Sequence, residues 1–281
     1  MFFYRLWYDF GSFSRLMVIG GNMIFVYFLI GFGILLLLYM AKEAFANRLL
    51  YHTLFFPEFP ESFEQVTIFF ISDIHRRNVS DKIITKAVGK ADIVIIGGDL
   101  TEKGVSFNKV KTNILKLKRI APVFFVWGNN DYEVEPHLLD TILLDCGVKV
   151  LANTAVKFES NSGDLFNLLG IDDLAEERDR LDYALQDAEK NGFRVLVSHN
   201  PEIIHKIKPE NNIHLVLSGH THGGQIRIFG YGPYEKGGIK KIGNITVFIS
   251  NGYGTTALPL RLGAKAETHL ITIKNQENRQ Y

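Results

Sequence analysis

Residues 122–131 read PVFFVWGNND, an apolar run that ends in two amides and a carboxylate. The run is short and rich in Val and Phe, which is typical of a strand buried on both faces of a sheet. Asn129, Asn130 and Asp131 therefore lie at the tip of a predicted strand. Such polar atoms form either a tight turn or part of a ligand site, and the other strand ends help to distinguish the two.

Four more segments repeat this order of an apolar strand followed by polar residues. They are QVTIFFI before SDIH (65–75), ADIVII before GGDL (91–100), FRVLV before SHNP (193–201) and IHLVL before SGHTHGG (213–224). Apolar spacings of three and four predict helices between the strands, over 81–90, 107–120, 133–147 and 177–192. Strands that alternate with helices predict an α/β fold with parallel strands. Residues around Leu49 and Tyr51 suit a first strand, and 244–250 and 268–274 look purely β.

The polar residues at the five strand ends are predicted to converge, because ligands of open α/β sheets bind at the carboxyl ends of strands. Each motif alone is weak, since Asp and Gly also favour turns. Together they form a set of metal-capable side chains: Asp73, His75, Asp99, Asn129, His199, His220 and His222.

The chemistry of this set predicts a pair of divalent metal ions. Its donors are oxygen and nitrogen, which favour manganese, iron or catalytic zinc over a structural zinc site. The set is too large for one ion, and two ions roughly 3.5–4 Å apart and bridged by a carboxylate would use it fully. Two dications carry four positive charges, while Asp73 and Asp99 return two negative ones. The positive remainder suits an anionic phosphoester that is attacked by a metal-bound hydroxide.

The order SDIH, GGDL, GNND, SHNP and GHTHGGQ resembles the calcineurin-like metallophosphoesterases. The tail VFISNGYGTTALPLRLGAKAETHLITI is similar to a bacterial membrane-associated branch that includes hydrolases of UDP-diacylglucosamine-type lipids. The resemblance implies two packed mixed β-sheets flanked by helices over residues 46–274. It also implies one ion on Asp73, His75, Asp99 and His222, and a second on Asp99, Asn129, His199 and His220. Asp99 would then be the bridge.

Asn130 departs from the family pattern, which usually has His at this position near the scissile phosphate. An amide donates a hydrogen bond but does not transfer a proton at neutral pH. We take Asn130 and Asp131 as the candidate catalytic residues beside the metal ligands. Asp172 and Asp173 follow another predicted strand, and a polar turn is their simpler interpretation. Two interpretations stay open for Lys240, Lys241 and Arg261: contact with phosphate or lipid headgroups, or simple solvation, which is usual for isolated basic residues.

Residues 16–41 carry no charge and are long enough to span a bilayer as a single transmembrane helix. A cleaved signal peptide ending near Ala46 is the alternative, although its apolar region is usually shorter, at ~7–15 residues. Two basic residues on each side leave the side of the membrane open. We expect a flank at 1–15 and a polar tail at 275–281.

Composition limits the partners. The net charge is +1, so a dedicated nucleic-acid surface is not expected, and Cys146, the only cysteine, suits helix packing. The predicted substrate is an anionic phosphoester, with lipid-linked and nucleotide-linked forms both open. Two rivals to a membrane phosphoesterase remain at this point: a metal-dependent nuclease, and a non-catalytic metal-binding scaffold.

Overall fold

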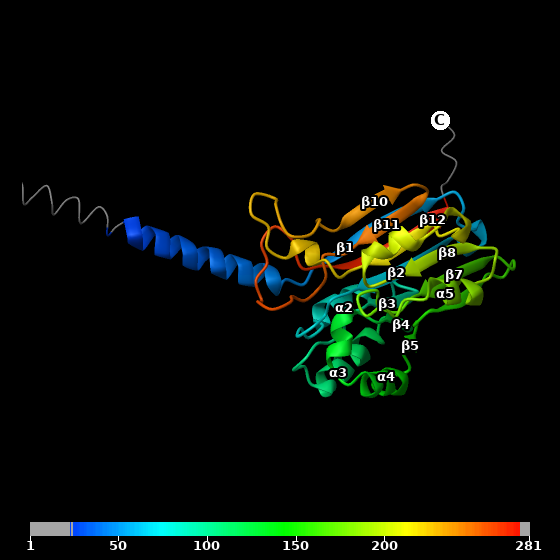
Figure 1. Ribbon diagram of the computed structural model, residues 1–281, viewed down its shortest axis with the longest axis horizontal. Coiled ribbons are helices and arrows are strands. Elements are labelled where there is room, and N and C mark those ends of the chain that lie inside the picture. The colour runs from blue at the N-terminus through cyan, green and yellow to red at the C-terminus, as the bar shows by residue number, and fades with distance from the viewer. Residues whose placement is uncertain (1–22, 24, 276–281) are drawn as a thin grey trace, which may run out of the picture. The chain divides into compact units, whose positions relative to one another are not determined.

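The computed structural model describes residue 23 and residues 25–275 of the chain (Figure 1). Its contacts divide the chain into two units, Met1–Lys42 and Glu43–Tyr281. A helix over Phe25–Ala44 is long and apolar enough to cross a membrane, by length and composition. It ends three residues after the predicted position 41, because Lys42 and Glu43 favour helix. The predicted flank 1–15 and the predicted helix start at 16–22 lie outside the described residues.

Among the described residues of the larger unit, twelve strands form two mixed six-stranded sheets, and the predicted fold class is confirmed. The first sheet, in spatial order, has β1 (Leu49–Phe56), β12 (Thr268–Asn275), β2 (Gln65–Ile71), β3 (Ile93–Gly97), β4 (Val123–Val126) and β5 (Lys149–Val150). The second has β10 (Gly238–Ile242), β11 (Ile245–Ile249), β9 (Leu215–Ser218), β8 (Phe193–Val197), β7 (Leu165–Gly170) and β6 (Thr154–Glu159).

In the described part of this unit, four α-helices lie on the outer faces of the sheets, with α2, α3 and α4 beside the first sheet and α5 beside β7 in Figure 1. They are α2 (Asp81–Ala87), α3 (Phe107–Leu117), α4 (Pro136–Asp145) and α5 (Leu181–Asp187). Short 3₁₀ helices are η1 (Glu61–Phe63), η2 (Asn129–Glu133), η3 (Pro201–Lys206), η4 (Pro209–Asn211) and η5 (His222–Gly224). Each α-helix is shorter than its predicted range. α2, for example, ends where Val88 adopts an extended conformation.

Alternation along the strands builds the layers. In β2, Ile68 and Phe70 point into the core between the sheets, while Phe69 and Ile71 pack against α2, α3 and α4. Side chains of the second sheet alternate in the same way, since Val195 of β8 faces the first sheet and Leu196 faces α5. Successive side chains of a strand point to opposite faces, so continuous apolar runs are buried on both sides.

Two features of the topology were not predicted. Strand β12 inserts between β1 and β2, parallel to the first and antiparallel to the second. Strands β6 and β10 have half-exposed, polar-rich sequences and gave no strand signal. Asn275, assigned to the polar tail, is the last residue of β12, and the rest of that tail lies outside the described residues.

The parallel strands position the site. In the first sheet β2, β3 and β4 run parallel, and in the second β8 and β9 do so. Their carboxyl ends therefore bring the loops after Ile71, Gly97, Val126, Val197 and Ser218 together.

Candidate metal centre

All seven predicted ligand side chains lie at this meeting point of strand ends. Five are buried, namely Asp73, His75, Asp99, His199 and His222. Asn129 and His220 are half-buried and complete the set. The predicted convergence of the strand-end residues is therefore present in the structure.

The first group consists of Asp73, His75 and His222, whose ligand atoms lie within 4.8 Å of one another. His75 Nε2 is 3.1 Å from His222 Nε2, and His222 Nε2 is 3.3 Å from Asp73 Oδ1. Two imidazole nitrogens that face each other and a carboxylate form a cluster of electron-pair donors. Such a cluster suits a shared cation.

The second group consists of Asp73, Asp99 and His199, also within 4.8 Å. His199 Nε2 is 3.2 Å from Asp99 Oδ2, which is also 3.6 Å from His75 Nε2. Asp99 Oδ2 is therefore within 3.6 Å of one histidine of each group, and Asp73 belongs to both groups. Beside it, His220 Nδ1 is 3.0 Å from Asn129 Oδ1.

The donor atoms fit a divalent cation. Asp73 Oδ2 is buried and has no hydrogen-bond partner among the described residues, while the buried His199 Nε2 lies 3.2 Å from Asp99 Oδ2. Buried polar atoms are nearly always paired, because leaving one unpaired costs about 1–3 kcal/mol. Oxygen and nitrogen ligands without thiolate suit the hard or borderline ions predicted from the sequence.

The backbone at the site is strained. Asp73, His75, Asp99, His220 and His222 all have positive φ, between 50° and 69°. The left-handed region costs of order 1–3 kcal/mol for each non-glycine residue and persists where the surroundings enforce it. Five of the seven ligand candidates adopt this left-handed conformation. At each of them the backbone turns sharply after its strand, and the side chain points toward a common centre.

Two glycines leave room for the ligands. A Cβ on Gly98 would lie 2.4 Å from His199 Nδ1, and one on Gly128 would lie 2.3 Å from Asp99 Oδ1. Gly98 also has φ of 84°, which disfavours any side chain. The glycines of GGDL and GNND thus permit close approach between strand ends as well as turning.

The charges of the site reinforce one another. Burial lowers the pKa of His199, but the charges of Asp99 and Asp73 outweigh it and raise the pKa to about 10. Burial also disfavours ionisation of Asp99, yet His199 and His75 hold the pKa of its carboxyl below the ordinary value. Burial lowers the pKa of His222 to about 4, so its ring is neutral and able to bind a cation.

Asn130 hydrogen-bonds to the central carboxylate. Its backbone N–H donates to Asp99 Oδ1 at 2.9 Å, and its side-chain Nδ2 donates to Asp99 Oδ2 at 2.8 Å. It also lines the cleft above the ligands. The catalytic role of Asn130 remains a prediction. The hydrogen bonds show a second role for this residue, which is to orient the carboxylate of Asp99.

Asp131 is fully buried, and it is not among the described residues that line the cleft. Its carboxylate accepts from the backbone N–H of Thr101 at 3.0 Å and of Gly128 at 3.0 Å. Burial and the nearby charge of Asp99 raise the pKa of Asp131 to about 8. Its catalytic role stays untested, and its contacts favour a positioning role that ties two ligand loops together.

Glu102 is a site residue that the sequence analysis missed. Its Oε2 lies 3.0 Å from His75 Nδ1, and its other oxygen pairs with Arg76. Carboxylates commonly hold the second nitrogen of a metal-binding histidine and fix its tautomer. The position three residues after Asp99, in GGDLTE, was the available signal.

Arg261, for which solvation is the usual interpretation, is fully buried. Its guanidinium donates to five backbone carbonyls, those of His222, Asn251, Gly252, Gly254 and Ala264. Burial lowers its pKa to about 10, so it remains charged at neutral pH. It holds the loop of His222 against the loop after β11 and places a fixed positive charge behind the centre.

Asp172 and Asp173 cap a polar turn. Burial raises the pKa of the Asp173 carboxyl, and this residue also lies close enough to the centre for the charges of His199 and Asp99 to act on that pKa. Asp172 accepts from the Tyr132 hydroxyl at 2.6 Å and pairs with Arg178 at 3.1 Å. Asp173 accepts two backbone N–H groups of its own turn.

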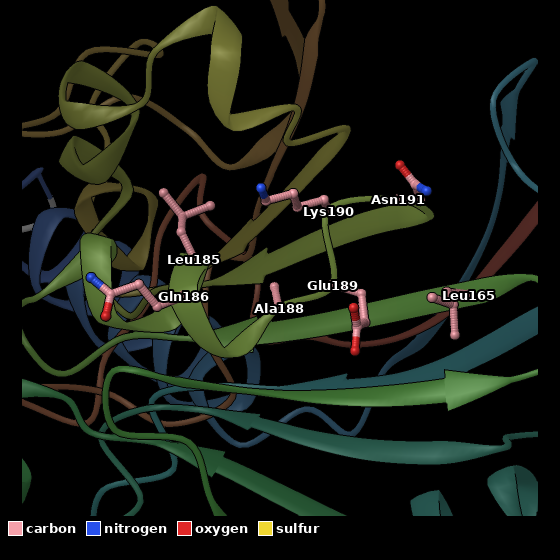
Figure 2. Close-up of a pocket in the computed structure, with 7 residues that line it drawn as sticks. All are labelled: Leu165, Leu185, Gln186, Ala188, Glu189, Lys190 and Asn191. Atoms are coloured by element: carbon pink, nitrogen blue, oxygen red, sulfur yellow. The ribbon is translucent and has the colours of Figure 1, made fainter.

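A cleft of about 360 Å³ opens above the ligands. Its lining includes Asp99, Asn129, Asn130 and His220 together with apolar and aromatic side chains such as Ile226, Tyr234 and Leu258. A second cavity, of about 610 Å³, is lined by Leu165 and residues 185–186 and 188–191 (Figure 2). Its only charged side chains among the described lining are Glu189 and Lys190, so the converging donors belong to the smaller cleft.

Comparison with known proteins agrees with this arrangement. Residues 66–224 match the family described as calcineurin-like phosphoesterase. YpbG of Bacillus subtilis (strain 168) is 46% identical over 214 residues, covering 75% of this chain and 82% of the relative. Phosphodiesterase YaeI of Escherichia coli (strain K12) is 28% identical over 245 residues, covering 80% and 88%. A 5′-nucleotidase precursor from Thermus thermophilus has TM-score 0.50 at 14% identity, covering 74% of this chain and 55% of that one, a likeness of fold alone.

Proposed function

The chain belongs to the calcineurin-like phosphoesterase family, and from this premise we propose that it is a membrane-anchored hydrolase using two divalent ions. Its reaction class is hydrolysis of phosphoric ester bonds. The bond that we propose is a phosphodiester or a pyrophosphate-type bond, lipid-linked or nucleotide-linked.

The observation that carries the two-ion proposal is the state of the buried donors. Asp73 Oδ2 is buried without a hydrogen-bond partner among the described residues, and it belongs to both groups of converging ligand atoms, the second of which contains His199 and Asp99. The proposed ligands of one ion are Asp73, His75, Asp99 and His222, and those of the other are Asp99, Asn129, His199 and His220. When bound, divalent ions supply positive charge for phosphate oxygens and lower the pKa of water.

The protein's own residues orient and hold this centre. Asn130 and the backbone position both oxygens of Asp99, while Asp131 ties the loops of Gly128 and Thr101. Arg261 adds fixed positive charge, which favours an anionic substrate.

The leaving group is the second part of the proposal. Asn130 lies in the cleft where a proton donor would be useful, and an amide does not transfer protons. A phosphate leaving group departs as a stable anion and needs no proton. This supports a nucleotide-linked or pyrophosphate-linked substrate over a simple alkyl diester.

The test is metal analysis of the purified full chain together with hydrolysis of bis(4-nitrophenyl) phosphate. We expect about two ions per chain, loss of activity on chelation, and recovery with Mn²⁺, Fe²⁺ or Zn²⁺. Full activity without metal would contradict the proposal. Tightly bound metal without hydrolysis of any aryl phosphodiester would favour the scaffold. Steeply salt-dependent binding of DNA or RNA would favour the nuclease.

Membrane anchoring is proposed from helix Phe25–Ala44, whose large apolar side chains, such as Phe28 and Leu35, are exposed. An apolar helix exposed on every side is costly in water and suits lipid. The full chain is expected in the membrane fraction, and deletion of residues 1–42 should move it to the soluble fraction with its metals retained.

A chain lacking residues 276–281 is the matched control and should stay with the membrane. Recovery of the full chain without detergent in the soluble fraction would contradict the anchor. A mature N-terminus at Asn47 would instead demonstrate signal cleavage.

A further inference from the structure

A tight hairpin beside the cleft presents a bulky side chain at its tip. Ile228 and Tyr231 exchange two backbone hydrogen bonds of 2.9 Å, so Phe229 and Gly230 form a two-residue turn. Both turn residues have positive φ, 50° and 85°, a geometry that favours Asn or Gly at the first position. Phe229 is nevertheless there, with 96% of its surface exposed. Neither backbone preference nor packing against the described residues explains a phenylalanine at this position.

Other exposed apolar side chains lie near Phe229. Tyr231 is 83% exposed and Ile228 is 62% exposed, while Tyr234 and Leu258 are exposed side chains that also line the cleft. We call these five residues the lip. Single exposed apolar residues are common on proteins, but a group of them around an active-site opening marks an interaction surface.

The lip is held in shape from below. The guanidinium of Arg227 donates to the carbonyls of Gly230, Gly223 and Tyr234, at distances of 2.5–3.1 Å. These hydrogen bonds therefore fix the hairpin to Gly223, in the loop of His222, and to Tyr234. A braced surface loses little conformational freedom when it binds.

The segment that carries four of the five lip residues has a positive net charge. Residues 226–242 contain Arg227, Lys236, Lys240 and Lys241 against one acidic residue, Glu235, a net charge of +3 from four minus one. Basic side chains near a bilayer are attracted to anionic lipid headgroups, and aromatic side chains favour the same interface.

We propose that the lip docks into the headgroup region of an anionic lipid bilayer, with Phe229 and Tyr231 entering first. The inference rests on the proposed function, a phosphoesterase anchored by its helix. Only residues 45–48 separate the end of that helix from β1, so the catalytic domain stays close to the bilayer that holds it. The docked cleft takes phosphoesters held in the membrane, with apolar lining residues such as Tyr234 and Leu258 beside their lipid part.

A fluorescence experiment on the full chain in vesicles of phosphatidylcholine and phosphatidylglycerol tests the docking. An environment-sensitive dye is attached to Phe229→Cys in a Cys146→Ala background, and the vesicles contain a spin-labelled lipid quencher. We expect a blue-shifted emission and strong quenching. The same dye at Ser162→Cys, in the exposed turn between β6 and β7, should remain unquenched. Equal, weak quenching at both positions would overturn the docking while leaving the anchor intact.

A second experiment compares one aryl phosphodiester bond in two settings, bis(4-nitrophenyl) phosphate in solution and a diacylglycerol 4-nitrophenyl phosphate in the vesicles. Phe229→Asp should reduce hydrolysis of the lipid ester by about tenfold and that of the soluble ester by less than about twofold. The matched control Tyr183→Asp changes an exposed aromatic of α5 and should affect neither. Equal effects of Phe229→Asp on both esters would overturn the proposal.

Different results would contradict the proposed anchor and the proposed docking of the lip. A full chain recovered without detergent in the soluble fraction contradicts the anchor alone, and the dye at position 229 then tests the lip with added vesicles. Loss of activity on both esters after chelation supports the metal centre and is independent of either outcome.

Discussion

Asp99→Asn is expected to lower metal content and to reduce kcat/KM for an aryl phosphodiester by about 10³-fold or more. Asp99 Oδ2 lies between His75 and His199, and Asn130 donates to both carboxylate oxygens. An amide of the same shape loses the negative charge and turns an N–H group toward one of these donors. The measurement is metal analysis of each purified variant followed by steady-state kinetics.

His205→Asn is the matched control for this change. His205 is exposed, pairs with Glu202 at 3.3 Å and lies outside the described cleft walls, so metal content and turnover should be unchanged. Circular dichroism of both variants separates loss of ligand from loss of fold. An Asp99→Asn protein with about two ions and normal turnover would contradict the two-ion centre.

Asn130→His is expected to raise the hydrolysis of esters with poor leaving groups, by about 10²-fold for alkoxides, because a positioned general acid typically contributes ~10²–10⁴-fold. The 4-nitrophenolate anion leaves without needing a proton, so the hydrolysis of 4-nitrophenyl esters should gain little. The measurement is the rate across a series of diesters with rising leaving-group pKa. A missing acid predicts that the gain increases along the series.

Asn130→Ala is the control, because it removes the Nδ2 bond to Asp99 without supplying an acid. Metal content must be measured in both variants, since the lost bond acts directly on the central carboxylate. A uniform loss of activity across the series in Asn130→His would contradict the missing-acid hypothesis. It would show that the amide itself acts on the substrate or on Asp99.

The sequence by itself determined the α/β class, the five strand ends and the ligand candidates. Strands such as β2 and β8 are short, apolar and bounded by polar residues, and their ranges were predicted residue for residue. Local patterns suffice there because burial on both faces imposes a continuous apolar run. Parallel strand order implies that the carboxyl ends within one sheet meet, and the packing of the two sheets then brings Asp73 of the first sheet next to His220 of the second.

Only the tertiary structure decided the features that depend on contacts between distant segments. The insertion of β12 between β1 and β2 follows from pairing of the two ends of the domain, and no local pattern specifies a partner strand. Arg261 looks like a surface residue until the loops of His222 and Asn251 bring their carbonyls around it. The hydrogen bonds of Asn130 to Asp99 and the exposure of Phe229 arise in the same way, because burial and hydrogen-bond partners are properties of the folded chain rather than of neighbours in sequence.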